Sequence, residues 1–189
     1  MRICMYGASS ETIAQEYLAA GEALGRELAR RGHGLVFGGG AKGMMGAAAR
    51  GVTAVGGEII GVAPGFFHVD GVLYEKCTEL IKTDTMRQRK ERMENLADAF
   101  LMVPGSIGTW EEFLEIFTLR QLKQHEKPIA VWNLLHYFDP MEALIQSAID
   151  RGFLKASCRT LYGIFETPEE ALDYLEACPQ RSEEAVAYR

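Results

Sequence analysis

The stretch from Ala99 to Leu119 constrains the fold of this chain most. It opens with the apolar run Ala99 to Val103, bounded by a Pro-Gly pair, which predicts a buried strand. The glycine-bearing loop Pro104 to Gly108 follows, and Thr109 and Glu112 then form the T-x-x-E pattern of a capping box, which predicts a helix start. A strand, a glycine loop and a helix N-terminus form an anion site, because free backbone N–H groups and the helix dipole both favour negative charge. We therefore expect a phosphate to bind here.

Strands alternate with helices along the rest of the chain. The predicted strands cover residues 2–6, 35–37, 58–63, 78–82, 99–103, 128–132 and 161–165. The predicted helices cover about residues 12–31, 47–55, 85–98, 109–122, 139–151 and 168–177. This alternation predicts an α/β fold of three layers, a mostly parallel sheet with helices on both faces. Three of the strands end in glycine-bearing loops, at the carboxyl edge where such sheets bind ligands.

Length and composition indicate one ordinary domain, which we expect over residues 1–178, with a flexible polar tail over 179–189. No signal peptide or run of ~20 apolar residues is evident, so we expect a cytoplasmic protein without a membrane segment. The net charge of −6 argues against a nucleic-acid surface, although not against a nucleotide. The four cysteines lack metal-ligand spacing, so we expect free thiols and no metal or other cofactor.

The loop Gly38 to Gly46, with the sequence GGGAKGMMG, follows a predicted strand and opens a helix. It lacks the dinucleotide-binding fingerprint and the Gly-Lys-Ser/Thr ending of a P-loop, so NAD binding and ATP hydrolysis are weakly supported. Tight packing of helix on sheet could account for some of its glycines. Three glycines in a row exceed that need and favour a ligand-binding role.

Arg89 lies on the apolar stripe that Met86, Met93 and Leu96 form on the predicted helix after Asp84. Burying its charge unpaired would cost several kcal/mol, so Arg89 must meet a carboxylate or a bound anion. The alternatives are a purely structural ion pair and a side chain that extends to solvent.

Glu112 shares a helical stripe with Ile116 and Leu119, which predicts that it points inward, whereas Glu111 points outward. From the pattern alone a structural role in the capping box is favoured over a functional one.

Three motifs together resemble the Lonely Guy (LOG) family of nucleotide phosphoribohydrolases. PGSIGTWEE at 104–112 is similar to the family's PGGxGTxxE, TMRQRK at 85–90 to its MHxRK segment, and GGGAKGMMG at 38–46 to its GGGxxGLMG loop. The resemblance implies a Rossmann-like fold and a homodimer. It also implies hydrolysis of the N-glycosidic bond of a purine nucleoside 5′-monophosphate, such as AMP or a cytokinin riboside monophosphate, to the free base and ribose 5-phosphate. The largely apolar circumference of the helix from Trp110 to Leu122 agrees with a dimer.

The family's catalytic arginine and glutamate fall on Arg89 and Glu112. The predicted substrate- and phosphate-binding residues, drawn from the glycine loops and the motifs, are Ser9, Gly39, Gly40, Gly43, Met45, Gly46, Lys90, Gly105, Ser106, Ile107, Gly108, Thr109 and Glu111.

Three positions depart from the family pattern: Ser106 replaces a glycine, Arg87 replaces a histidine, and Gly71, beside Asp70, stands where an acidic residue is usual. Members of the family have often been labelled lysine decarboxylases, but no pyridoxal-phosphate lysine motif is evident. A non-catalytic nucleotide-binding sensor or carrier on the same fold is the main alternative function, and phosphoryl or ribosyl transfer is an enzymatic one.

Overall fold

The structure, a computed structural model, describes residues 1–67 and 70–178, so the predicted tail at 179–189 lies outside the described residues. Its strands are β1 (Arg2–Tyr6), β2 (Gly34–Phe37), β3 (Ile59–Pro64), β4 (Glu79–Thr83), β5 (Ala99–Met102), β6 (Ile129–Trp132) and β7 (Gly163–Phe165). Its α-helices are α1 (Gln15–Arg30), α2 (Gly43–Ala54), α3 (Met86–Leu96), α4 (Ile107–Gln121), α5 (Asp139–Asp150) and α6 (Pro168–Ala177). Every predicted strand and helix is present within a few residues of its expected bounds.

The strands form one seven-stranded sheet in the order β4-β3-β2-β1-β5-β6-β7. All six strand pairs are parallel, with Met5 opposite Phe37 between β1 and β2, and Tyr6 opposite Met102 between β1 and β5. The chain builds outward from β1 to β4 on one side and then returns to β5 on the other side of β1. The strand order therefore reverses between β1 and β5, and ligands bind in the crevice at such a reversal in open parallel sheets.

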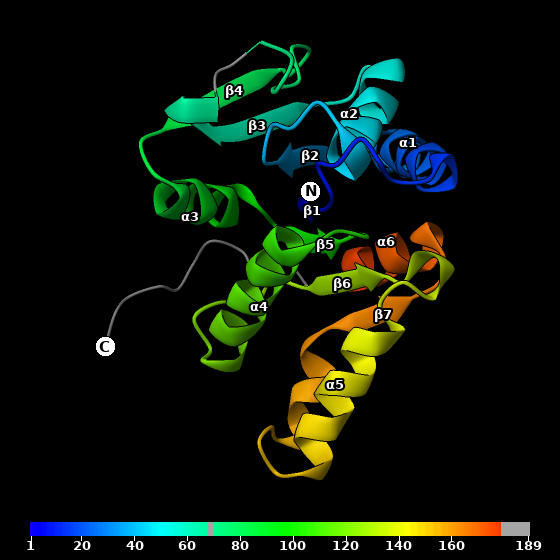
Figure 1. Cartoon of the computed structure of the whole chain (residues 1–189), viewed down its shortest axis with the longest axis vertical. Helices are drawn as coiled ribbons and strands as arrows, with labels where there is room; N and C mark the ends of the chain where they lie inside the picture. Colours follow the sequence, from blue (N-terminus) through cyan, green and yellow to red (C-terminus); the bar gives the residue numbers. More distant parts are fainter. Residues whose placement is uncertain (68–69, 179–189) are drawn as a thin grey trace.

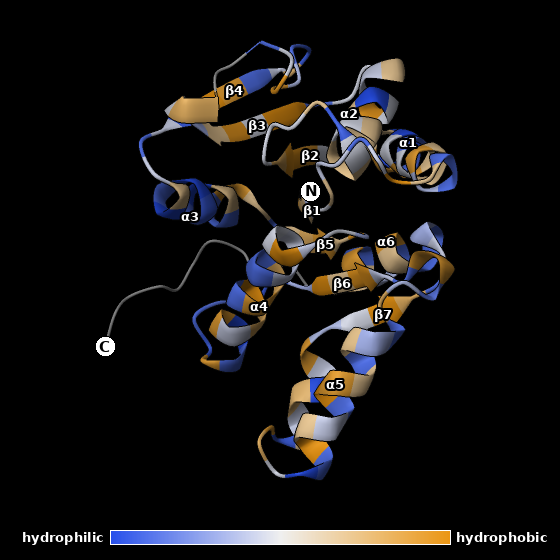
Figure 2. Ribbon diagram, in the orientation of Figure 1, coloured by the Kyte–Doolittle hydropathy of each residue, from blue (hydrophilic) through white to orange (hydrophobic). Residues whose placement is uncertain are grey.

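Helices cover both faces of the sheet, so the predicted three-layer α/β fold is confirmed (Figure 1). The core on one face joins α1, α2 and α6 to the sheet, with Leu24, Met44 and Leu172 among its buried residues. The core on the other face joins α3 and α4 to the sheet through Met93 and Phe113. The central strands are hydrophobic along their length, whereas α3 is largely hydrophilic (Figure 2), as expected for strands buried on both faces.

The helix after β5 begins earlier than the sequence pattern predicts. Its N-cap residue is Ser106, whose carbonyl oxygen accepts a hydrogen bond from the Trp110 N–H at 3.0 Å. Thr109 is buried inside the first turn, so the predicted capping box of Thr109 and Glu112 is wrong. The T-x-x-E pattern makes a box only when the threonine stands at the N-cap, and here the helix begins soon after Gly105. Glu112 is thereby free to pair with another side chain.

Smaller differences lie at other element ends. α1 begins at Gln15 rather than near Thr12, and α2 begins at Gly43, inside the predicted glycine loop. Thr85 is the N-cap of α3 and forms a capping box with Gln88.

All four cysteines are free: Cys4 and Cys158 are buried, and Cys77 and Cys178 are half-buried. No helix in the described ranges is long and apolar enough to cross a membrane.

Candidate active site

The loops after β1, β2 and β5 meet at Ala8. Its N–H donates a hydrogen bond to the Pro104 carbonyl oxygen at 3.1 Å, and its own carbonyl accepts one from the Met45 N–H at 3.2 Å. Gly43 and Gly105 permit this approach, because an added Cβ would lie 2.4 Å from Ala8 O in the first case and 2.9 Å from Ala8 N in the second. Gly43 also has a φ of +61°, which glycine tolerates best. These two glycines are therefore explained by packing of the loops.

A cavity of about 310 Å³ lies where the three loops meet. Of the predicted site residues, the structure brings together Ser9, Gly40, Met45, Arg89, Ser106, Gly108, Thr109 and Glu112 as part of its lining. Residues from segments far apart in the sequence thus face one space at the carboxyl edge of the sheet.

Arg89 and Glu112 form a buried ion pair in the cavity wall. Arg89 Nη2 donates to Glu112 Oε1 at 2.8 Å, and each residue is 8% exposed. Burial raises the pKa of Glu112 above its ordinary value of 4.5, and the charge of Arg89 opposes that rise. The prediction that Arg89 meets a carboxylate is confirmed, as is the inward orientation of Glu112.

Room for the guanidinium of Arg89 comes from Gly38, where an added Cβ would lie 2.3 Å from Nη2. Arg89 Nη1 has only the weak acceptor Met86 Sδ, at 3.9 Å, and Nε is buried without a hydrogen-bond partner in the described structure. The guanidinium therefore keeps donor capacity beyond its bond to Glu112. Gly38 was not among the predicted site residues, because the need for glycine there comes from Arg89, which lies on α3 and is distant in sequence.

Several predicted binding residues lie outside the cavity lining. Lys90 forms ion pairs with Glu111 and, at 3.0 Å, with Glu115, so Lys90 and Glu111 satisfy each other on the outer side of α3 and α4. Ile107 is 75% exposed and lies on the surface of α4.

Two further glycines are required by the backbone of the second glycine loop, residues 38–46, which follows β2. An added Cβ on Gly46 would lie 1.9 Å from the Ala41 carbonyl oxygen. Gly39 has a φ of +78°, and its carbonyl accepts a hydrogen bond from the Tyr74 N–H at 2.8 Å. Backbone conformation accounts for Gly39, and close approach of loop backbone accounts for Gly43 and Gly46, rather than the packing of a helix on the sheet.

The segment after β3 lines the cavity with apolar side chains that were not among the predicted site residues, including Phe67, Val72 and Leu73. It is attached to the second glycine loop by a hydrogen bond from the Ala41 N–H to the Val72 carbonyl oxygen, at 3.0 Å. The signal that could have identified it is its composition, since the exposed loop of a monomer seldom holds so many large apolar residues.

Backbone angles and exposure describe the positions that depart from the family pattern. Ser106 has a φ of −104°, so a side chain is accommodated without strain, and it lines the cavity. Gly71 has a φ of +76°, which an acidic side chain would adopt less readily. Arg87 and Asp70 are both exposed.

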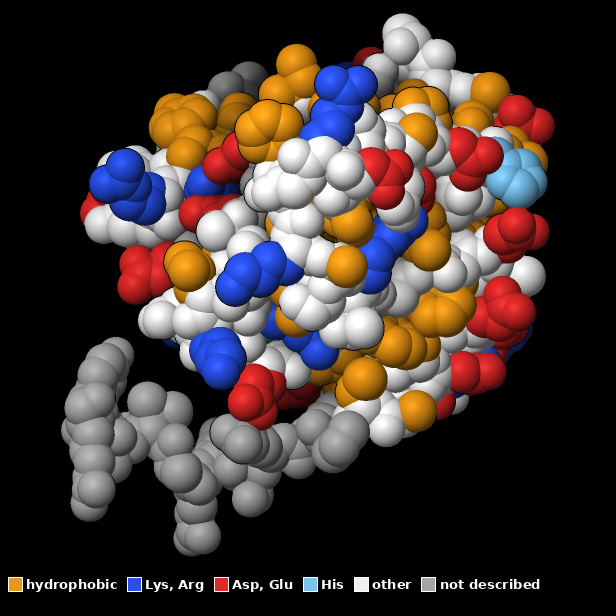
Figure 3. Space-filling view, turned by 90° about the horizontal axis from the view of Figure 1, so that it is seen from below, with side chains coloured by type: hydrophobic (Ala, Val, Ile, Leu, Met, Phe, Trp, Pro, Cys, Tyr) orange, Lys and Arg blue, Asp and Glu red, His pale blue; other side chains and the backbone are white. Residues whose placement is uncertain are grey.

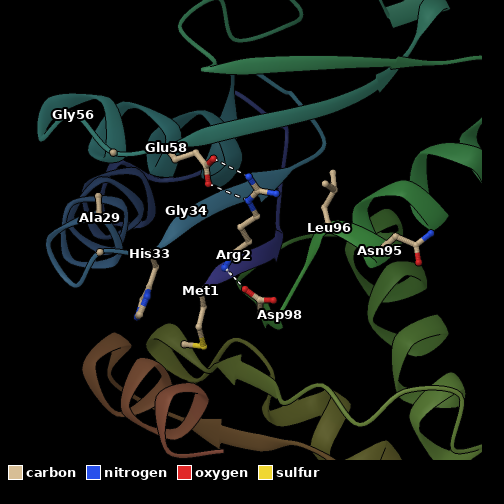
Figure 4. A pocket seen from close by; sticks show the side chains of 12 residues that line it. Met1, Arg2, Ala29, His33, Gly34, Gly56, Glu58, Asn95, Leu96 and Asp98 are labelled. Atoms are coloured by element: carbon tan, nitrogen blue, oxygen red, sulfur yellow. Dashed lines mark hydrogen bonds and ion pairs between the residues drawn. The ribbon is translucent and has the colours of Figure 1, made fainter. Parts of the chain in front are cut away.

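A second cavity, of about 710 Å³, lies at the opposite, amino end of the strands (Figure 4). There the Arg2 guanidinium donates to both oxygens of Glu58, at 3.2 and 3.0 Å, and the Arg2 backbone N–H donates to Asp98 at 2.7 Å. Because these charged groups already satisfy one another, we place the candidate active site in the smaller cavity. No group of three or more His, Cys, Asp or Glu residues within 1–67 and 70–178 is arranged to hold a metal ion.

Comparisons with known proteins point to one family. A family model described as "Possible lysine decarboxylase" matches residues 45–175. The cytokinin riboside 5′-monophosphate phosphoribohydrolase LOG of Oryza sativa subsp. japonica is 37% identical over 175 residues, which cover 93% of this chain and 72% of that protein. The cytokinin riboside 5′-monophosphate phosphoribohydrolase LOG2 of Arabidopsis thaliana is 33% identical over 186 residues, which cover 98% of this chain and 87% of that protein.

Solved structures of lower identity share the fold. The molybdenum cofactor carrier protein of Chlamydomonas reinhardtii matches with a TM-score of 0.70 at 21% identity, over 94% of this chain and 98% of that one. The molybdenum cofactor binding protein of Rippkaea orientalis matches with a TM-score of 0.68 at 18% identity, over 93% and 95% of the two chains. At these identities the likeness concerns the fold alone.

Proposed function

The chain belongs to the LOG family of phosphoribohydrolases, and from that premise we propose that it hydrolyses the N-glycosidic bond of a purine nucleoside 5′-monophosphate. The substrate is AMP or a cytokinin riboside monophosphate, and the products are the free base and ribose 5-phosphate. The observation that carries this proposal is the buried pair of Arg89 and Glu112 in a cavity at the carboxyl edge of the sheet.

The phosphate binds at the N-terminus of α4. The first backbone N–H groups of a helix have no partner within it, and the helix dipole adds partial positive charge. Ser106 makes no side-chain hydrogen bond to cap this end, and an added Cβ on Gly108 would meet nothing within 4 Å. The end of the helix is thus open to a phosphate at the cavity wall. Binding energy from the phosphate positions the distant glycosidic bond.

Glu112 acts on the ribose and on water. As the C1′–N bond breaks, its electron pair leaves with the base and positive charge develops on the ribose, as in glycoside cleavage generally. The Glu112 carboxylate stabilises that charge and accepts a proton from the water whose oxygen bonds to C1′. The departing base takes up a proton from solvent and Glu112 returns its own to solvent, so the products are the free base, ribose 5-phosphate and an ionised Glu112.

Arg89 keeps Glu112 active and has donors left for the ligand. Its positive charge favours the ionised carboxylate against the effect of burial. Its remaining N–H groups donate to the phosphate or to the departing base. The apolar side chains of Met45, Leu73 and Met86 offer a surface for the base.

The experiment that tests the proposal is to incubate the protein with AMP and measure adenine and ribose 5-phosphate. Hydrolysis gives equal amounts of the two, and adenosine reacts far more slowly because it lacks the phosphate. A ribosyl transferase would instead join the sugar to an acceptor other than water. Binding of AMP without any product would contradict the proposal and favour a sensor or carrier.

A further inference from the structure

We propose that Lys42 is a further substrate-binding residue, whose ammonium group leaves Glu11 and binds the 5′-phosphate of the nucleotide. This inference rests on the proposed function and deepens it. Lys42 lines the cavity together with Ser9 and Gly40. It lies within the GGGAKGMMG loop, at a position where the family's GGGxxGLMG pattern specifies no residue type, so the motif did not place it among the predicted binding residues.

The charges in the cavity lining leave the phosphate short of a cation. Among the described lining residues the charged side chains are Lys42, Arg89 and Glu112. Arg89 and Glu112 neutralise each other, so Lys42 is the cation in the described lining whose charge no lining carboxylate neutralises. Lys90, predicted from the motif, does not line the cavity and is held by two glutamates of α4.

The present partner of Lys42 is easily exchanged. Lys42 Nζ lies 2.8 Å from Glu11 Oε1, and the two side chains are 47% and 64% exposed. An ion pair this exposed contributes little stability. A phosphate offers more negative charge and more acceptor oxygens than a carboxylate, so it competes well for the ammonium group.

The position of Lys42 also suits an anion. Lys42 is the N-cap residue of α2, and the first turn of α2 contains no acidic residue. The partial positive charge of this helix end and the ammonium group therefore add to the charge of the α4 N-terminus in favouring an anion in the shared cavity. In this structure the ammonium group of Lys42 is paired with Glu11, which does not itself line the cavity.

The test is Lys42→Met, assayed by calorimetric binding of ribose 5-phosphate and by steady-state hydrolysis of AMP. We expect the Kd for ribose 5-phosphate and the KM for AMP to rise ~10-fold or more, the effect of losing one charge-assisted hydrogen bond. The kcat should change by less than ~3-fold, because the contact is made equally in the ground and transition states. Lys42→Arg should restore most of the affinity.

Two controls separate the proposal from general effects. Lys155→Met makes the same charge change at an exposed lysine outside the cavity lining, and it should leave Kd and KM unchanged. Glu11→Gln removes the competing carboxylate, so binding of ribose 5-phosphate should stay equal or become tighter.

A Lys42→Met protein that melts normally and binds ribose 5-phosphate within ~2-fold of the wild type would overturn the role of Lys42. Weaker binding of ribose 5-phosphate by Glu11→Gln would also overturn it, because it would mean that the intact Lys42–Glu11 ion pair, and not the released lysine, is needed for binding. The binding measurement needs no turnover. A wild-type protein that binds ribose 5-phosphate through Lys42 but releases no adenine would therefore refute the proposed function alone.

Discussion

Arg89 is held between a carboxylate and a glycine. Glu112 neutralises its charge at 2.8 Å, and Gly38 leaves the space that the guanidinium occupies. The pattern of apolar residues on α3 placed Arg89 on the apolar face of the helix, because helical periodicity is a local property of the sequence, but it left open a side chain that extends to solvent. The identity of its partner was not predictable from that pattern, since Glu112 lies on another helix and its motif also fitted a cap.

Gly38→Ala tests whether the position of Arg89 matters. The new Cβ would lie 2.3 Å from Nη2, so the guanidinium must move relative to Glu112. We expect kcat for AMP to fall ~10-fold or more in a protein that still folds, because small displacements of catalytic groups cost much activity. Gly65→Ala is the control, since its Cβ would meet nothing nearer than 4.0 Å. Wild-type kcat in Gly38→Ala would show that Arg89 tolerates displacement.

The pH dependence of the reaction should report Glu112. Burial raises the pKa of this carboxyl above 4.5, and the mechanism needs the ionised form. A carboxyl is protonated below its pKa, so kcat/KM, which reports the free enzyme, should fall on the acid side, with a midpoint above 4.5. A kcat/KM profile measured from about pH 4 to about pH 8 checks this. A flat profile across that range would mean that no such carboxylate is required.

The elements of the fold are more predictable than their ends. Short apolar runs in the sequence mark buried strands such as β1 and β5, and the spacing of apolar residues marks the helices that follow them. The alternation of strands and helices, and hence the parallel sheet, therefore follows from the sequence. The position at which α4 starts does not follow from the sequence. Ser106 and Thr109 are both residues that favour the N-cap position, and the packing of the preceding loop decides between them. The segment around Leu73 has no local periodicity, and contacts with residues distant in sequence place it, among them the hydrogen bond from Ala41 to Val72 and the one between Tyr74 and Thr53 of α2.

The two helices that carry the candidate catalytic pair differ in how they begin. The Thr85 hydroxyl accepts from the Gln88 N–H at 3.2 Å, whereas Ser106 makes no side-chain cap at α4. Thr85→Ala should therefore lower the free energy of unfolding by ~1 kcal/mol, and Ser106→Ala by less than about half of that. Urea unfolding of the two variants measures the difference. Equal losses would contradict the assignment of the caps.

At the scale of the whole molecule, the surface near the candidate site is unusually apolar. Ile107, Trp110 and Leu114 form one stripe on α4, with 75%, 42% and 50% of their surfaces exposed. Apolar side chains also reach the surface in several places among charged ones on the face shown in Figure 3. A stripe of this kind next to a cavity is typical of an interface between protein chains.

We therefore expect a homodimer, or an assembly built from dimers, with α3 and α4 near the interface. Light scattering should give a mass of at least twice the chain mass of 21.0 kDa. Leu114→Asp should dissociate the dimer, because a carboxylate in an apolar interface is costly, whereas Leu144→Asp on α5 should not. A clean mass of 21.0 kDa for the wild type at micromolar concentration would count decisively against the dimer.

Glu112 is the carboxylate proposed to carry the reaction, and Glu112→Gln tests that role directly. The substitution keeps the size of the side chain but removes its charge and its ability to accept a proton from water. We predict that release of adenine from AMP falls by ~10² or more, while AMP still binds through the backbone N–H groups of the loops. Adenine release, AMP affinity and melting temperature should be measured on the same preparation. A folded Glu112→Gln protein with near-normal turnover would contradict the mechanism.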